Sequence, residues 1–589
     1  MFAFTALAFV LGLSAYGLDQ EKETSAPEHF IQSVSLQEAE AWAEKTLATL
    51  SLERKIGQMI CEQMRGEYIA EDEPRFVHLL RLIKDYGVGG FVLYGGTPHD
   101  TARLLNRLQQ ESGLPLLISA DFEGGPGQQI AGATEFPANM ALSAIGSEDL
   151  AYLVGKVGAT EGRAMGIHLT YSPVVDIQTQ PDNPVLGVRS FGADIELLGR
   201  MAGAYIRGYQ ENGMLATAKH YPGRGDVELI PGTEFTINRK PAGQVETEDL
   251  AAFKKAIDAG VTFIMSEHIA VPSLTEGSDL PASVHETLAR DWLRDRLGFG
   301  GILTTDDMWY EKVVRRFGAV KACVMTVRAG HDVILKPADA VATIEGLVEA
   351  VRKGEIPEKQ IDQSVRKIIY WKARLNLHRR HFVDESRISS LVGTQEHKKI
   401  AQEIADRSLT LLKNDGFFPS EPSRLGKIVH LSLQRKEVDQ APRVVAARLK
   451  ADFPSLESFF LGPHTSDRYY EEALKASVSA DTVAISLFLP RTVYKDNGIL
   501  AEKEMTFFEK VIALKPDSTI VMSYGNPYHA DRFTRASAFL VGYGEGGFYG
   551  NQTIYADSFI KLLKGDISPG GRLPVRISDD FPSGSGIIY

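Results

Sequence analysis

The chain has 589 residues, of which 44% are hydrophobic and 24% charged, and its formal net charge is -12. A single hydrophobic core stops growing at roughly 250 to 300 residues, so this length predicts at least two domains. The acidic excess argues against nucleic acid as a partner, and two cysteines, Cys61 and Cys323, are too few for a disulfide framework.

The first segment, Met1 to Ala15, is apolar and leads through Tyr16 and Gly17 into an acidic stretch. Such a run before small residues is typical of a secretory signal peptide, and it also fits an N-terminal membrane anchor. We expect residues 1–17 to be one or the other, and the protein to be exported to the periplasm or the extracellular space. No later stretch is apolar enough to span a bilayer, so no membrane span is expected in the mature chain.

From residue 36 to about 378, short apolar runs alternate with amphipathic helical patterns such as Ala251 to Ala259 and Ala340 to Lys353, which is typical of βα units around a parallel sheet. The strands are predicted near Gln58 to Glu62 and at Val88 to Tyr94, Leu116 to Asp121, His168 to Asp176, Leu215 to His220, Phe263 to Ile269, Ile302 to Thr305 and Val333 to Lys336. This count approaches that of a (β/α)8 barrel. An open, doubly wound sheet has the same alternation, so both architectures stay open at this point.

Residues 379–400 are charged and have no clear period, which predicts a linker. After it, Ala401 to Leu412 has a helical pattern, and apolar runs recur between further helical patterns. The strands predicted there are Ile428 to Leu433, Thr482 to Leu489, Thr519 to Ser523 and Ala538 to Tyr543. Residues 401–589 are therefore predicted to form a second, smaller α/β domain.

Polar residues follow nearly every predicted strand of the first domain. In parallel α/β barrels the carboxyl ends of the strands meet at one face, and residues there bind the substrate and carry the chemistry. The set is Asp121, Glu123, Asp176, Arg189, Lys219, His220, Glu267, His268, Asp306 and Asp307. Carboxylates, cations and imidazoles that converge in this way suit a hydroxyl-rich neutral ligand, and a sugar is the natural candidate.

Each of these residues also has a purely structural interpretation. An Asp after a strand often caps the next helix, which applies to Asp306. His268 alone fits a histidine satisfied within the core, and Lys219 could form an ion pair with Asp176. Because so many polar residues coincide at successive strand ends, we favour a functional site and count His268 among the groups that would bind the substrate.

Five stretches in chain order carry a resemblance to a known family. They are Asn183-Pro184-Val185, Arg189-Ser190-Phe191-Gly192, the run AKHYPGRGD from Ala218 to Asp226, Gly298-Phe299-Gly300-Gly301, and Thr305-Asp306-Asp307-Met308. Together they resemble the ordered motifs of family 3 glycoside hydrolases, and within that family the bacterial β-N-acetylglucosaminidases. Supporting matches lie at residues 120–125, 329–335, 408–414 and 571–575, so the similarity runs from about residue 36 to the end.

The resemblance implies a (β/α)8 barrel followed by a smaller α/β sandwich domain. By position it implies that Asp306 is the nucleophile and that Asp121, Arg189, Lys219 and His220 hold the hydroxyl groups of the sugar. The implied mechanism is retaining: a carboxylate attacks the anomeric carbon, and a second group protonates the leaving oxygen and then activates water. The family requires no metal or organic cofactor.

One motif of the N-acetylglucosaminidase branch is missing. In that branch the loop after the Lys-His pair carries an Asp-Ser-His triplet whose histidine is the acid/base, whereas this chain has Ile230-Pro231-Gly232. General acid catalysis contributes roughly a hundred- to ten-thousand-fold, so its loss would slow hydrolysis. As replacements we favour Glu234 or Glu228 of the same loop over Asp226. The candidates in the second domain are Glu502, Glu504 and Glu545.

A second departure follows Glu123, where the arginines that help bind the sugar in the family give way to Gly125-Pro126-Gly127-Gln128-Gln129. Losing guanidinium groups alters the pocket, so the sugar specificity stays open. The function expected is a retaining glycoside hydrolase that removes a β-linked terminal sugar, N-acetylglucosamine, from peptidoglycan- or chitin-derived material. Two alternatives stay open: a sugar-binding protein that has lost activity, and a glycoside phosphorylase in which phosphate replaces water.

Overall fold

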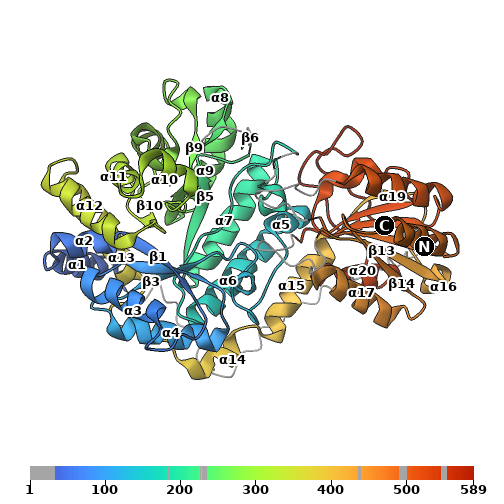
Figure 1. Cartoon of the computed structure of the whole chain (residues 1–589), viewed down its shortest axis with the longest axis horizontal. Coiled ribbons are helices and arrows are strands. Elements are labelled where there is room, and N and C mark those ends of the chain that lie inside the picture. The colour runs from blue at the N-terminus through green and yellow to red at the C-terminus, as the bar shows by residue number, and fades with distance from the viewer. Residues whose placement is uncertain are drawn as a thin grey trace, which may run out of the picture.

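The computed structural model describes residues 34–181, 183, 185–225, 227–228, 235–435, 440–489, 500–544 and 553–589, with the backbone alone at residue 228. These residues form two α/β domains that the helix α15 (Gln395–Ser408) connects (Figure 1). The predicted signal peptide or anchor, residues 1–17, lies outside the described residues. In the part of the chain that is described, no helix is both long and apolar enough to cross a membrane.

The first domain is a barrel of eight parallel strands in the order β10-β8-β5-β4-β3-β2-β1-β11. A bridge between Thr304 and Val333 brings the two edges of this sheet together. The strands are β1 (Ile60–Arg65), β2 (Gly90–Tyr94), β3 (Leu117–Ala120), β4 (Leu169–Thr170), β5 (Leu215–Tyr221), β8 (Phe263–Ser266), β10 (Ile302–Thr305) and β11 (Ile334–Leu335). The nearly closed sheet confirms the predicted barrel and excludes the open, doubly wound alternative.

Helices surround this barrel and cover the outer face of the sheet (Figure 1). They include α1 (Leu36–Leu47), α2 (Leu52–Gln58), α3 (Pro74–Arg81), α4 (Pro98–Glu111), α5 (Asn139–Ile145), α6 (Glu148–Ala164), α7 (Ile195–Glu211), α8 (Ala242–Val245), α9 (Ala251–Asp258), η7 (Leu288–Arg296), α10 (Glu311–Phe317), α11 (Ala319–Ala329), α12 (Ala340–Arg352) and α13 (Glu358–Arg374). Because both faces of the strands are covered, all four residues of β3, β8 and β10 are buried. This explains the continuous apolar runs from which the strands were predicted.

The predicted strand His168 to Asp176 is shorter in the structure. Only β4 forms a regular strand there, because Pro173 has no N–H to donate to a strand ladder. Val174 then bridges to Lys219, so the chain still runs beside β5 as far as the site.

The second domain is built on a six-stranded sheet with the order β12-β17-β16-β15-β13-β14, in which only the β12–β17 pair is antiparallel. Its strands are β12 (Thr410–Asn414), β13 (Ile428–Leu433), β14 (Glu457–Leu461), β15 (Thr482–Leu487), β16 (Thr519–Ser523) and β17 (Ala538–Val541). Helices α16 (Pro422–Leu425), α17 (Gln440–Asp452), α18 (Asp467–Val478), α19 (Glu502–Leu514) and α20 (Ile554–Lys564) complete it.

One prediction for this region is corrected. The helix expected over residues 401–412 begins at Gln395 and ends at Ser408, and β12 follows it, because pairing with β17 overrides the local helical pattern. Strand β14 was not predicted from the sequence. The stretch 379–400 contains η8 (Glu385–Arg387), α14 (Ile388–Leu391) and the start of α15.

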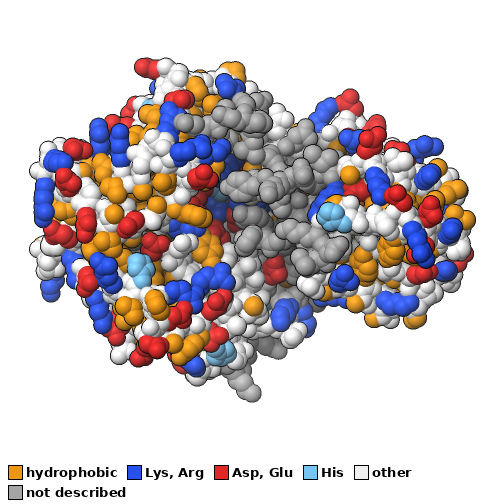
Figure 2. All heavy atoms as spheres, in the orientation of Figure 1, with side chains coloured by type: hydrophobic (Ala, Val, Ile, Leu, Met, Phe, Trp, Pro, Cys, Tyr) orange, Lys and Arg blue, Asp and Glu red, His pale blue; other side chains and the backbone are white. Residues whose placement is uncertain are grey.

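Backbone hydrogen bonds join the two domains. Ala138 N–H donates to the Tyr543 carbonyl at 2.8 Å, Ala193 N–H to the Pro574 carbonyl at 3.1 Å, and Arg572 N–H to the Ala144 carbonyl at 2.9 Å. On the described part of the face shown in Figure 2, Lys and Arg side chains lie interspersed with Asp and Glu.

Candidate active site

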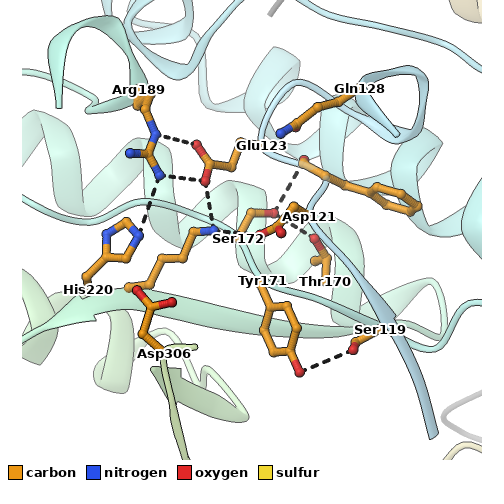
Figure 3. Close-up of polar contacts among 12 residues, drawn as sticks. Ser119, Asp121, Glu123, Gln128, Thr170, Tyr171, Ser172, Arg189, His220 and Asp306 are labelled. Atoms are coloured by element: carbon orange, nitrogen blue, oxygen red, sulfur yellow. Dashed lines mark hydrogen bonds and ion pairs between the residues drawn. The ribbon is translucent and has the colours of Figure 1, made fainter. Parts of the chain in front are cut away.

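The polar residues predicted at the strand ends do gather at one face of the barrel. Asp121 directly follows β3, Lys219 and His220 lie at the carboxyl end of β5, and Asp306 directly follows β10. Figure 3 shows Arg189, Glu123, Asp121, His220 and Asp306 converging on this end of the strands. The site is therefore built from segments that are far apart in the sequence.

Two cations and two carboxylates form a buried network in this site. Glu123 accepts a bidentate ion pair from Arg189, with both N–O distances at 2.8 Å, and Lys219 Nζ lies 2.7 Å from Glu123 and 2.8 Å from Asp121. Burial would raise the pKa of Glu123, but the charges of Arg189 and Lys219 outweigh it and lower that pKa to about 2. Glu123 is thus ionised at neutral pH.

Asp121 is the member of this network that reaches solvent, since 21% of its side chain is exposed against 3 to 4% for the others. Fixed carboxylate and ammonium groups of this kind accept hydrogen bonds from hydroxyl groups and donate to them. The arrangement fits the role in sugar binding that the family resemblance implies for Asp121, Arg189 and Lys219.

The side chain of His220 is buried and is held in place by Asp176. Its Nδ1 lies 2.7 Å from Asp176 Oδ2, and its Nε2 lies 3.5 Å from Arg189 Nη2. Burial and the nearby cations lower the pKa of His220 well below 6.5. Because a guanidinium only donates, Nε2 must accept, so His220 is a neutral imidazole whose Nδ1–H donates to Asp176. The ion pair suggested between Lys219 and Asp176 does not form.

Asp306 occupies the position expected of a nucleophile. Its Oδ1 accepts the N–H of Asp307 at 2.7 Å, its Oδ2 lies 3.5 Å from Arg224 Nη2, and 23% of its side chain is exposed. Burial would raise the pKa of Asp306, but the charge of Arg224 outweighs it and holds that pKa below its usual value. The carboxylate is therefore ionised and accessible, as attack on an anomeric carbon requires.

His268 supports the segment that contains Asp306 and Asp307. Its Nδ1 lies 2.8 Å from Ser283 Oγ, its Nε2 lies 3.0 Å from the Asp307 carbonyl, and its ring stacks on Tyr310 with 5.5 Å between centroids. Both ring nitrogens have partners inside the protein, so the imidazole holds the backbone after Asp306 in place. A direct hydrogen bond from His268 to the sugar stays a prediction.

Two cations in the site were missed from the sequence. Arg224 was noted only as part of a motif, yet its guanidinium contacts both Asp306 and Glu267. Lys336 lies after β11, and its Nζ is 2.7 Å from Asp307 Oδ2 and 5.3 Å from the ring of the exposed Trp309. The available signal was their position: one follows β5 and the other follows β11.

The loops that depart from the family pattern are described in part. Gln128 Oε1 accepts the N–H of Gly124 at 2.9 Å, so this side chain folds back on its own loop (Figure 3). Its buried Nε2 has no hydrogen-bond partner among the described residues.

The structure describes only some of the predicted acid/base residues. Glu234, Asp226 and Glu545 lie outside the described residues, and Glu228 is described only as backbone of β6 (Val227–Glu228), which pairs with β7 (Thr236–Asn238). In the second domain, Glu504 is buried, pairs with Arg435 at 2.7 Å, and accepts the Ala501 N–H at the start of α19. These bonds give Glu504 a structural role.

Arg224 gives the site a testable pH dependence. Replacing Arg224 with methionine removes the positive charge nearest to Asp306, so the pKa of Asp306 should rise. The acidic limb of kcat/KM should then move to higher pH, because a smaller fraction of Asp306 is ionised at low pH. A pH profile of the wild type, Arg224→Met and the distant control Arg296→Met checks this. An acidic limb that stays in place in Arg224→Met would contradict the role of Arg224.

Within the described residues, no group of three or more His, Cys, Asp or Glu side chains is placed to hold a metal ion.

Known proteins resemble the chain in sequence. Residues 51–370 match the profile of the glycosyl hydrolase family 3 N terminal domain. The chain is 28% identical over 555 residues to a β-N-acetylglucosaminidase/β-glucosidase of Cellulomonas fimi, which covers 91% of this chain and 95% of that protein. It is 33% identical over 270 residues to a β-hexosaminidase of Tolumonas auensis, which covers 44% of this chain and 79% of that protein.

Solved structures share the two-domain architecture. A β-glucoside phosphorylase superposes with a TM-score of 0.80 at 25% identity, over 94% of this chain and 99% of that one. A glycoside hydrolase family 3 β-N-acetylglucosaminidase from Paenibacillus sp. strain FPU-7 superposes with a TM-score of 0.77 at 27% identity, over 90% of this chain and 99% of that one. The family profile spans more than half of the chain, and the motif residues meet at one face of the barrel, so the chain belongs to glycosyl hydrolase family 3 and is a glycosidase related to the β-hexosaminidases.

Proposed function

We propose that the protein is a retaining glycosidase that removes a β-linked terminal sugar through a covalent intermediate on Asp306. The observation that carries this proposal is the ionised, accessible Asp306 carboxylate, 3.5 Å from Arg224 at the carboxyl end of β10. A carboxylate held in this state can attack an anomeric carbon, and its ester can later be cleaved by water. The fixed network around Asp121 and Lys219 would hold the hydroxyl groups of the same sugar.

The sugar we propose is N-acetylglucosamine, from peptidoglycan- or chitin-derived material. The relatives named as β-N-acetylglucosaminidase and β-hexosaminidase support this choice. The name of the Cellulomonas protein also includes glucosidase, so glucosides belong in the same assay. We further propose that the protein is exported through the segment Met1 to Ala15, which cell fractionation of the full-length chain would test.

A screen of aryl β-glycosides tests the proposed function. The wild type should release the phenol from N-acetylglucosaminides or glucosides, and a slow substrate such as a 2-deoxy-2-fluoroglycosyl fluoride should leave a sugar covalently bound. Peptide mapping by mass spectrometry should locate that sugar on Asp306. Activity without any label on Asp306, or a label on another residue, would contradict the mechanism, and no phenol release from any glycoside would favour a sugar-binding protein.

Phosphorolysis is the second candidate function. It is favoured by the likeness to a β-glucoside phosphorylase over 94% of this chain. In that reaction phosphate, instead of water, attacks the anomeric carbon of the glycosyl-enzyme and releases a sugar 1-phosphate. Adding inorganic phosphate to the assay and measuring sugar 1-phosphate separates the two functions, because a hydrolase releases free sugar at a rate that phosphate does not increase.

A further inference from the structure

We infer that Glu267 is the second carboxylate of the reaction, which gives a proton to the leaving oxygen and later accepts one from the attacking water. This inference rests on the proposed retaining function. It assigns the proton-transfer role that the missing Asp-Ser-His triplet would otherwise fill, and it assigns it to a residue outside the loop of Glu228 and Glu234.

The barrel brings Glu267 beside Asp306. Strands β8 and β10 are neighbours in parallel register, with Ser266 opposite Thr305, and Glu267 and Asp306 are the next residues of the two strands. The Asp306 N–H donates to the Ser266 carbonyl at 2.7 Å, which continues the pairing past the last registered pair. Residues opposite each other in a sheet point to the same face. Both carboxylates therefore belong to the same side of the site.

One guanidinium nitrogen links the two carboxylates. Arg224 Nη2 lies 3.5 Å from Asp306 Oδ2 and also donates to Glu267 Oε1. The distance between Asp306 Oδ2 and Glu267 Oε1 therefore cannot exceed the combined length of these two contacts. Retaining glycosidases hold their two carboxyl groups about 5 to 5.5 Å apart, a spacing that this shared nitrogen allows.

Glu267 is held firmly but keeps one oxygen available. Its side chain is 10% exposed, its N–H donates to the Tyr221 carbonyl at 2.9 Å, and its carbonyl accepts the Ser283 N–H at 3.2 Å. Among the residues that the structure describes, Oε1 has Arg224 as its partner and Oε2 has none. Oε2 can therefore exchange a proton while Arg224 keeps the carboxyl group in place.

The other described carboxylates of the site are engaged elsewhere. Asp307 binds Lys336 and accepts the Trp309 indole N–H, Asp121 and Glu123 bind Lys219, and Asp176 binds His220. Within the described part of the chain, Glu267 alone shares a cation with Asp306. That shared position distinguishes it from carboxylates that only balance buried charge.

In the first step, Asp306 Oδ2 bonds to the anomeric carbon, the bond to the leaving oxygen breaks, and the proton on Glu267 Oε2 passes to that oxygen. In the second step, water bonds to the anomeric carbon, the ester bond to Asp306 breaks, and a proton of the water passes to Glu267. Ester formation removes the negative charge of Asp306, so Arg224 then pairs with Glu267 alone.

The test uses the variants Glu267→Ala and Glu267→Gln, with Glu228→Ala and Glu234→Ala as matched controls. Substrates are the 2,4-dinitrophenyl and 4-methylumbelliferyl glycosides of the sugar that the wild type cleaves. For both Glu267 variants we expect the better leaving group to give a rapid burst of phenol, followed by turnover reduced about a hundred- to ten-thousand-fold. The poorer leaving group should show no burst. Azide should restore turnover of Glu267→Ala and yield a β-glycosyl azide.

Several outcomes would overturn this assignment. One is azide rescue of Glu228→Ala or Glu234→Ala in place of Glu267→Ala, and another is wild-type turnover of both substrates by the Glu267 variants. A loss of the burst in folded Glu267→Gln would also contradict it. None of these affects the role of Asp306. Failure of the proposed function is seen separately, as no phenol release by the wild type from any glycoside or full activity in Asp306→Ala.

Discussion

Replacing Asp306 with asparagine should reduce kcat for aryl glycosides by about ten-thousand-fold or more, the scale on which removing a nucleophile acts in other covalent enzymes. Asparagine keeps the shape of the side chain but cannot form the glycosyl ester. Since the Asp306 side chain is 23% exposed and lies at a strand end, the thermal unfolding midpoint should change little. Steady-state kinetics together with circular dichroism would measure both effects.

Asp307→Asn is the matched control for this substitution. Asp307 is the next residue and is also a carboxylate, but it pairs with Lys336 at 2.7 Å instead of facing Arg224. Its loss should weaken activity far less than the loss of Asp306. If the two variants were equally active, or if Asp306→Asn kept wild-type kcat, the site would not work through a nucleophilic Asp306.

Glu123→Gln should have the largest effect on stability, with a free energy of unfolding about 3 to 5 kcal/mol lower than that of the wild type. The substitution leaves Arg189 and Lys219 buried with one fewer anion between them. Sugar binding should also weaken, because glutamine offers Arg189 one acceptor oxygen where the carboxylate offers two, each at 2.8 Å. Thermal unfolding at pH 7 and substrate KM measure these two effects.

The difference in the free energy of unfolding between wild type and Glu123→Gln should depend on pH in a defined direction. The pKa of Glu123 is lowered from 4.5 to about 2 in the folded protein, which corresponds to about 3 kcal/mol. That stabilisation is fully present above pH 4.5 and is lost as the pH falls from 4.5 towards 2, so wild type and Glu123→Gln should converge there. Glu135 is a control of opposite sign: burial raises its pKa to about 7, so Glu135→Gln should not destabilise the protein at pH 7. Equal stability of Glu123→Gln and wild type at pH 7 would contradict the network.

Much of the first domain was predictable because barrel strands such as β3, β8 and β10 are buried on both faces. Burial of both faces leaves a continuous apolar run in the sequence, as in Phe263 to Ser266 and Ile302 to Thr305, and the next polar residue marks the strand end. This rule located Glu267 and Asp306 before their contacts were known. It failed for β12, where pairing with β17 and not the local pattern decides the structure.

The connections within the site were less predictable than its members. That Lys219 would bind Asp121 and Glu123 rather than Asp176 depends on the spacing of β3, β4 and β5 around the barrel, which sequence spacing does not encode. Arg224 reaches Asp306 from a different loop, and no local pattern distinguishes a guanidinium that faces the site from one that faces solvent.

The junction between the domains bears on how the sugar is held. Two of the hydrogen bonds between the domains involve Ala138, which donates, and Ala144, which accepts. Asn139 lies between these two residues, and its side-chain amide donates to the Arg189 carbonyl at 2.9 Å. A relay of hydrogen bonds therefore runs from the second domain through α5 to the arginine of the binding network. The barrel without the second domain would keep the strand that ends at Asp306 but would lose the hydrogen bonds that support the backbone behind Arg189.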